Sequence, residues 1–94
     1  METLNLIKAL ADENRMKIIE LLQKYNYCVG SLAKELGISD SAVSQHLKIL
    51  REAELVEKLM IGHFCYYQVN KETLRTLSKR IKEMASIKPA KGIR

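Results

Sequence analysis

Residues 39–56 read SDSAVSQHLKILREAELV, and they form two unlike faces when wound as a helix at about 100° per residue. Ser39 suits the N-cap, because its hydroxyl can accept from a free amide of the first turn. The outward face is polar and capable of hydrogen bonding: Ser41, Ser44, Gln45, Lys48, Arg51 and Glu52. The inward face is mainly aliphatic: Ala42, Val43, His46, Leu47, Ile49, Leu50 and Ala53. Small hydroxyl and amide groups can read base edges, so we interpret this helix as a groove reader rather than an ordinary solvated helix.

His46 falls on the apolar half, about 160° from the centre of the polar face. We therefore expect it to pack beside the preceding helices with a ring nitrogen bonded to a backbone or side-chain partner, and not to read bases.

The flanking sequence predicts further elements. Hydrophobic periodicity indicates helices over 1–12, 13–24, 29–37 and 71–86, with Asp12 or Asn14 capping the second. Two β-favouring runs, 55–61 and 64–69, meet around Gly62 as a hairpin. This order predicts a mainly α fold with a β-hairpin (α+β), a winged helix-turn-helix of about five helices and a two- or three-stranded wing sheet. One domain is expected over 1–86, followed by a flexible basic tail over 87–94.

Length and charge restrict the classes of function. A chain of 94 residues with 47% hydrophobic residues suffices for one compact domain. The net charge is +5, with −1 over residues 1–40 and +6 over 41–94, which favours a polyanion such as nucleic acid. No segment reaches the roughly 20 apolar residues of a membrane span, and no secretion signal is evident, so we expect a cytoplasmic protein without a membrane partner.

Enzyme chemistry is not indicated. The sequence lacks a glycine-rich phosphate loop, a convincing carboxylate pair and a Ser-His-Asp or Cys-His pattern. Two binding functions remain open: a DNA-binding regulator, and a winged-helix module that binds protein partners with weak or non-specific DNA binding.

Three runs resemble the ArsR/SmtB family of winged-helix repressors: KALADENRMKIIELL (8–22), YCVGSLAKELGISDSAVSQHLKILREAELV (27–56) and GHFCYYQVN (62–70). The resemblance implies a homodimeric transcriptional repressor that binds double-stranded DNA at an imperfect palindrome and releases it when an effector binds. It implies pairing through the first and last helices. The apolar residues available there are Leu4, Ile7, Leu74, Leu77, Ile81 and Met84, although either stripe can instead pack within the monomer.

The same resemblance implies DNA contacts at Ser41, Val43, Ser44 and Gln45, with Lys48 in support and Arg51 available on the same polar face. Three departures from the family are visible. Asp40 stands where glutamine is frequent, the wing offers only Lys58 and His63 to a minor groove, and Glu54 replaces a usual glycine. We expect Glu54 to adopt the glycine's backbone at a small strain cost.

The effector sites of the family are incomplete in this sequence. Its Cys-Val-Cys thiolate pair is represented by Cys28-Val29-Gly30, and residues 71–94 contain no His, Asp or Cys. No metal site is therefore predicted. Cys28 and Cys65 can approach if the segment before the third helix pairs with the second strand, which would suit a thiol-reactive or soft-metal effector. We favour the simpler interpretation that both are packed thiols.

Overall fold

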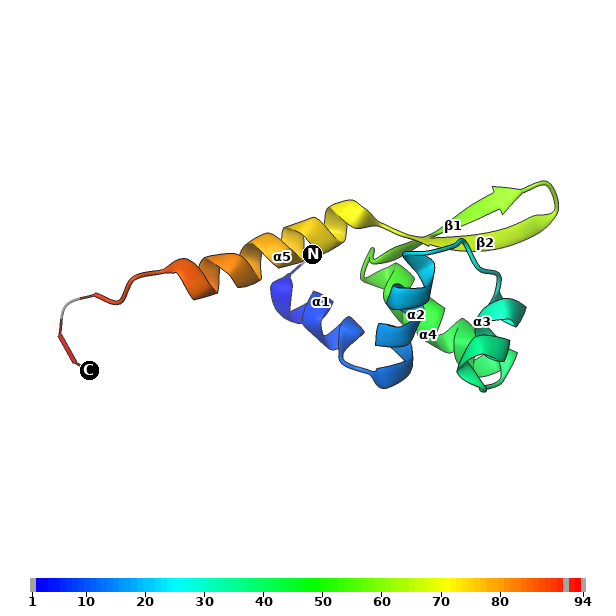
Figure 1. Ribbon diagram of the computed structural model, residues 1–94, viewed down its shortest axis with the longest axis horizontal. Helices are drawn as coiled ribbons and strands as arrows, with labels where there is room; N and C mark the ends of the chain where they lie inside the picture. The colour runs from blue at the N-terminus through cyan, green and yellow to red at the C-terminus, as the bar shows by residue number, and fades with distance from the viewer. Residues whose placement is uncertain (1, 91, 94) are drawn as a thin grey trace.

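The computed structural model describes residues 2–90, 92 and 93, and it contains five helices and one hairpin. In chain order these are α1 (Thr3–Leu10), α2 (Glu13–Leu22), α3 (Val29–Leu36), α4 (Asp40–Glu52), β1 (Val56–Ile61), β2 (Phe64–Val69) and α5 (Lys71–Ser86). The predicted winged helix-turn-helix is confirmed (Figure 1). The predicted basic tail remains a prediction, and its residues Lys91 and Arg94 lie outside the described part of the chain.

Local capping sets the helix limits. The Asp12 carboxylate accepts from the Arg15 amide at 3.0 Å and starts α2, so Asp12 and not Asn14 is the cap. The Ser39 hydroxyl accepts from the Ala42 amide at 3.1 Å and starts α4, as expected. Between α3 and α4 the chain turns at Gly37, whose φ of 66° lies in the left-handed region that glycine adopts without a Cβ clash.

The sheet is a two-stranded antiparallel ribbon in which Val56 pairs with Val69 and Ile61 with Phe64. Its two-residue loop is Gly62-His63, and Gly62 has φ of 61°. Tyr27 adds an isolated antiparallel bridge to Tyr67, with the Tyr67 amide donating to the Tyr27 carbonyl at 2.8 Å. We call the hairpin, residues 56–69, the wing.

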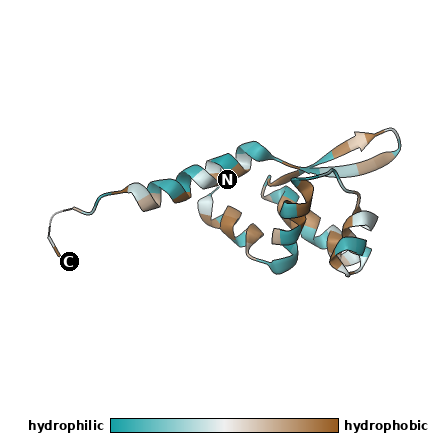
Figure 2. Cartoon of the chain, in the orientation of Figure 1, coloured by the Kyte–Doolittle hydropathy of each residue, from teal (hydrophilic) through white to brown (hydrophobic). Residues whose placement is uncertain are grey.

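The core lies where α1 to α4 and the base of the wing meet. Its fully or almost fully buried members come from every element: Leu6, Ala9, Ile18, Ile19, Leu22, Leu32, Ala33, Val43, Leu47, Leu50, Ala53, Leu55, Val56, Tyr67, Val69 and Leu77. Helix α5 leaves this body after its first turns and extends away from it (Figure 1), and the molecule spans 60 × 24 × 21 Å. Apolar positions recur along this projecting helix (Figure 2). Among the described residues, no helix has the length and apolar character needed to cross a membrane.

Candidate nucleic-acid interface

Helix α4 presents most of the predicted DNA-reading residues to solvent. Ser41, Ser44, Gln45 and Lys48 are exposed on one side of the helix, and Asp40 is exposed at its first turn. The hydroxyl, amide and carboxylate groups among these five side chains can read base edges, and the Lys48 ammonium can also hold a phosphate.

The predicted contact through Val43 is wrong. The Val43 side chain is 0% exposed and packs in the core, so it cannot touch a base. Its own position on the inward face of the helix already placed it there, whereas the resemblance assigned it to DNA. Val43 instead packs α4 against the other helices of the core.

The end of α4 is held by a Schellman motif. The Leu55 amide donates to the Leu50 carbonyl and the Glu54 amide to the Arg51 carbonyl, both at 2.9 Å. Glu54 has φ of 60°, so the expectation that it adopts the backbone of the usual glycine is confirmed. Leu50 and Leu55 are both fully buried, and this contact accompanies the motif and sets the angle at which the wing leaves α4.

The side chain of Arg51, in the last turn of α4, lies on the side of the helix that faces the wing and is only partly exposed. Burial raises the pKa of the Tyr67 hydroxyl, the neighbouring Cys65 adds to the rise, and the Arg51 guanidinium opposes it. The Arg51 side chain is thus close to Tyr67 of β2, and it is less exposed than Lys48.

The wing carries few charges and many exposed apolar side chains. Lys58 and His63 are exposed, as a minor-groove or phosphate contact requires. The tip, however, exposes Met60, Ile61 and Phe64. Phe64 also contacts Tyr66, with ring centroids 6.5 Å apart. The alternative function left open by the sequence, a winged-helix module that binds protein partners, depended on the apolar character of this hairpin.

His46 packs on the inward side of α4, as predicted. Its Nδ1 lies 3.3 Å from Arg15 Nη1 and 3.7 Å from Asp12 Oδ2, and its side chain is 18% exposed. The hydrogen bond from the Arg15 amide lowers the pKa of the Asp12 carboxyl, burial opposes this, and the positive charge of Arg15 lowers the pKa further. Arg15 was missed in the sequence because its partner lies 31 positions away.

The terminal stripes divide between core and surface. Leu77 is 5% exposed and Leu74 packs partly against the core, so both side chains are largely covered within the monomer, and their place at a dimer interface stays a prediction. The remaining predicted interface residues are exposed: Leu4, Ile7, Ile81 and Met84.

Positive charge concentrates on α5 and not on α4. Helix α5 carries Lys71, Arg75, Lys79, Arg80 and Lys82.

The two cysteines make separate contacts. The Cys28 sulfur lies 3.2 Å from the Ser31 hydroxyl, and hydrogen bonds from Ser31 lower the pKa of the Cys28 thiol. The Cys65 sulfur donates to the Tyr66 carbonyl at 3.9 Å. Both thiols are half-buried and free. The bridge register places Tyr66, not Cys65, opposite Cys28, and side chains alternate between faces along a strand. A joint thiol site stays a prediction.

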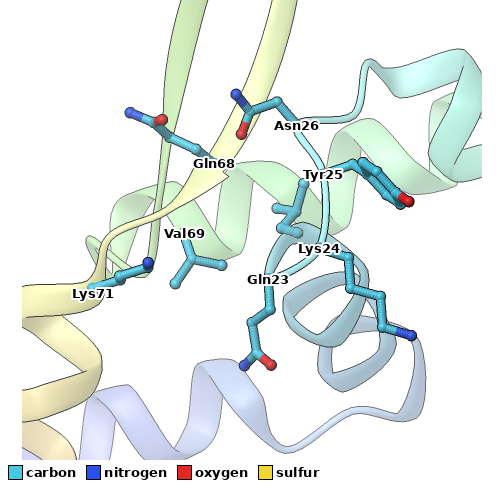
Figure 3. A pocket seen from close by; sticks show the side chains of 8 residues that line it. Gln23, Lys24, Tyr25, Asn26, Gln68, Val69 and Lys71 are labelled. Carbon is cyan, nitrogen blue, oxygen red and sulfur yellow. The ribbon is translucent and has the colours of Figure 1, made fainter.

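A hollow lies at the base of the wing, between the end of α2, β2 and the start of α5 (Figure 3). Amide side chains of Gln23, Asn26 and Gln68 line it together with Lys71, and no residue of α4 does. Within residues 2–90, 92 and 93, no three His, Cys, Asp or Glu side chains gather as metal ligands.

Comparison with known proteins agrees with this geometry. Residues 12–58, half of the chain, match the profile of the family described as bacterial regulatory protein, arsR family. The chain is 37% identical over 71 residues to the transcriptional repressor SdpR of Bacillus subtilis, covering 76% of this chain and 79% of that one. It is 41% identical over 71 residues to the arsenical resistance operon repressor of the same organism, covering 74% and 68%.

Solved structures give the same result for the whole fold. An ArsR-like transcriptional regulator from Rhodococcus sp. RHA1 superposes with a TM-score of 0.82 at 26% identity, covering 89% of this chain and 79% of that one. Reduced HlyU from Vibrio cholerae superposes with a TM-score of 0.69 at 31% identity, covering 85% of each chain. The chain therefore belongs to the arsR family, and it is a winged-helix, DNA-binding transcriptional regulator and not an enzyme.

Proposed function

We propose that this regulator is a repressor that binds a palindromic operator as a homodimer and acts in the cytoplasm, where its DNA partner is. The observation that supports DNA reading best is the exposed row of Ser41, Ser44, Gln45 and Lys48 on α4. Gln45 suits an adenine edge, Ser44 suits any base edge, and Lys48 suits a phosphate or guanine. Asp40 is proposed to accept from a cytosine amine, because a carboxylate repels phosphate.

The dimer is proposed from the exposed apolar residues of the two terminal helices. Helix α1 packs on α5 in the monomer, and Leu4, Ile7, Ile81 and Met84 remain uncovered around that contact. A two-fold axis through this region would cover them from the partner and would project the two copies of α4 to opposite ends of the dimer. Two half-sites of an inverted repeat would then be read together.

Gel-shift titration of the DNA upstream of the protein's own gene tests this proposal. We expect a complex with two chains per operator at moderate salt, weakened by Gln45→Ala and by Ser44→Ala. Glu20→Ala is the matched control, because Glu20 is exposed on α2 and belongs to no proposed contact. Equal binding to operator and to unrelated DNA would refute the repressor function.

A second candidate function is favoured by the wing tip. Met60, Ile61 and Phe64 are exposed together on a wing with few charges, and exposed apolar patches mark interaction sites. Under this alternative the wing binds a protein partner and DNA binding is weak. Equal binding to operator and to unrelated DNA in the titration above, together with loss of function when the wing-tip residues are substituted, would support this alternative.

A further inference from the structure

Arg15 joins three helices through one residue. Its amide donates to the Asp12 carboxylate at 3.0 Å at the start of α2. Its Nε donates to the Ala9 carbonyl in the last turn of α1 at 2.6 Å. Its Nη1 lies 3.3 Å from His46 Nδ1, in the middle of α4. The guanidinium therefore fixes α4 relative to the junction of α1 and α2.

The contact lies directly behind the DNA-reading face. His46 is flanked in sequence by Gln45, which is exposed, and by Leu47, which is 1% exposed and packed in the core. Arg15 is half-buried, and the side chains of His46 and Asp12 are 18% and 34% exposed, so water competes only partly for the contact. A shift of the His46 ring moves the same helical turn that carries Gln45 and Ser44.

The chemistry of the contact requires neutral histidine. A guanidinium only donates hydrogen bonds, so His46 Nδ1 must accept, and the ring proton must lie on Nε2. In the imidazolium both ring nitrogens carry protons, and Nδ1–H would then face a cation. The acceptor available to that proton is Asp12 Oδ2, 3.7 Å away. Protonation would therefore exchange the partner of His46 from Arg15 to Asp12.

Other charged groups packed near α4 lie toward its ends. On α1, Lys8 lines a hollow with Ile49 and Glu52, beyond His46 toward the C-terminal end. On α3, Lys34 lines a hollow with Asp40 at the N-terminal end. On β1, Glu57 and Lys58 are exposed. The groups that contact the His46 ring itself are Arg15 and Asp12.

We infer that Arg15 is a positioning residue for the recognition helix α4, acting through neutral His46, and that protonation of His46 releases this tie and weakens operator binding. The inference rests on the proposed DNA-binding role of α4. It gives this regulator a sensitivity to acid, because histidine is the side chain that ordinarily changes charge between about pH 5 and 8.

Fluorescence anisotropy with a labelled operator from about pH 5.5 to 8 at fixed salt tests the tie. The sequence has two histidines, so every protein carries His63→Gln, which leaves His46 as the one histidine. We expect operator affinity to fall by about tenfold on acidification, the factor typical of losing one hydrogen bond to a charged group. A gain of positive charge alone would strengthen binding to DNA, so the sign of the effect is diagnostic.

Two variants isolate the contact. In His46→Asn the amide oxygen stands where Nδ1 accepts but does not titrate, so the affinity profile is expected to be flat across the pH range. Arg15→Met keeps much of the apolar stem and removes the donors, so binding is expected to be weaker at pH 8 and to show no further fall on acidification. Retention of the pH dependence in His46→Asn would overturn the inference.

Nitrogen-15 NMR of the His46 ring separates failure of this inference from failure of the proposed function. We expect the Nε2–H tautomer at pH 8 in the His63→Gln protein; the Nδ1–H tautomer would overturn the tie whether or not DNA is bound. If no DNA is bound specifically at any pH, the proposed function fails. The tautomer, together with lower amide protection factors in α4 on acidification, after correction for the intrinsic pH dependence of exchange, then decides whether the tie itself exists.

Discussion

The substitution Ile81→Glu tests the proposed dimer at a position that the monomer leaves open. Ile81 is 49% exposed on the projecting half of α5, and burying a whole isoleucine contributes about 2 kcal/mol. Roughly half of that, about 1 kcal/mol, remains to be gained by each protomer. Two copies lose about 2 kcal/mol on substitution, which raises the dimer Kd by at least about 30-fold. Carboxylates placed in an apolar contact raise it further.

Sedimentation equilibrium over a range of protein concentrations measures that Kd, and circular dichroism confirms that the fold is retained. Ser86→Glu is the matched control, because it adds the same charge to the same helix about 140° around from Ile81. Leu77→Glu is unsuitable, since Leu77 is buried in the monomer core and its loss would unfold the chain. A wild-type Kd in folded Ile81→Glu would refute the placement of the interface on α5.

Three further substitutions test separate parts of the account. Val43→Ala should lower the free energy of unfolding by about 1–3 kcal/mol, because two buried methyl groups are lost, while the operator affinity of the folded protein stays the same; weaker DNA binding without destabilisation would restore Val43 as a DNA contact. Glu54→Gly should raise the free energy of unfolding by about 1 kcal/mol in urea titration by relieving the left-handed backbone, and a loss of stability would show that the Glu54 side chain makes a favourable contact. Lys48→Ala should make the slope of log K against log salt less steep by about 1.8 for a dimer, between roughly 50 and 200 mM, and an unchanged slope would remove Lys48 from the phosphates.

The elements of the fold could be predicted because their signals are local. Ser39, the residue before α4, caps the helix with its hydroxyl. Gly37 allows the turn between α3 and α4 because its φ is positive, and Glu54, just after α4, has the positive φ expected of a glycine. Each of these depends on a few neighbouring residues. The polar face of α4 was equally predictable, since an angle of about 100° per residue determines which side chains share a side.

Features that depend on distant parts of the chain could not be read in this way. The seam of α5 is periodic, but periodicity does not tell which part meets α1 and which part leaves the body, so Leu77 and Ile81 looked alike. The Arg15 contact with His46 joins residues 31 positions apart and has no sequence signal. Val43 was misassigned for another reason. The family resemblance implied a DNA contact there, although the helical periodicity of about 100° per residue placed Val43 on the inward face.

The central claim is that the exposed row of α4 reads sequence, and the specificity ratio tests it most directly. This ratio is the affinity for operator divided by the affinity for unrelated DNA of equal length, from competition titration at one salt concentration. We expect a wild-type ratio of about 10³ or more. Gln45→Ala should reduce it by roughly tenfold or more, because each base contact of this kind discriminates by about 1–3 kcal/mol. A ratio near one for the wild-type protein, or a ratio that Gln45→Ala leaves unchanged, would contradict the claim.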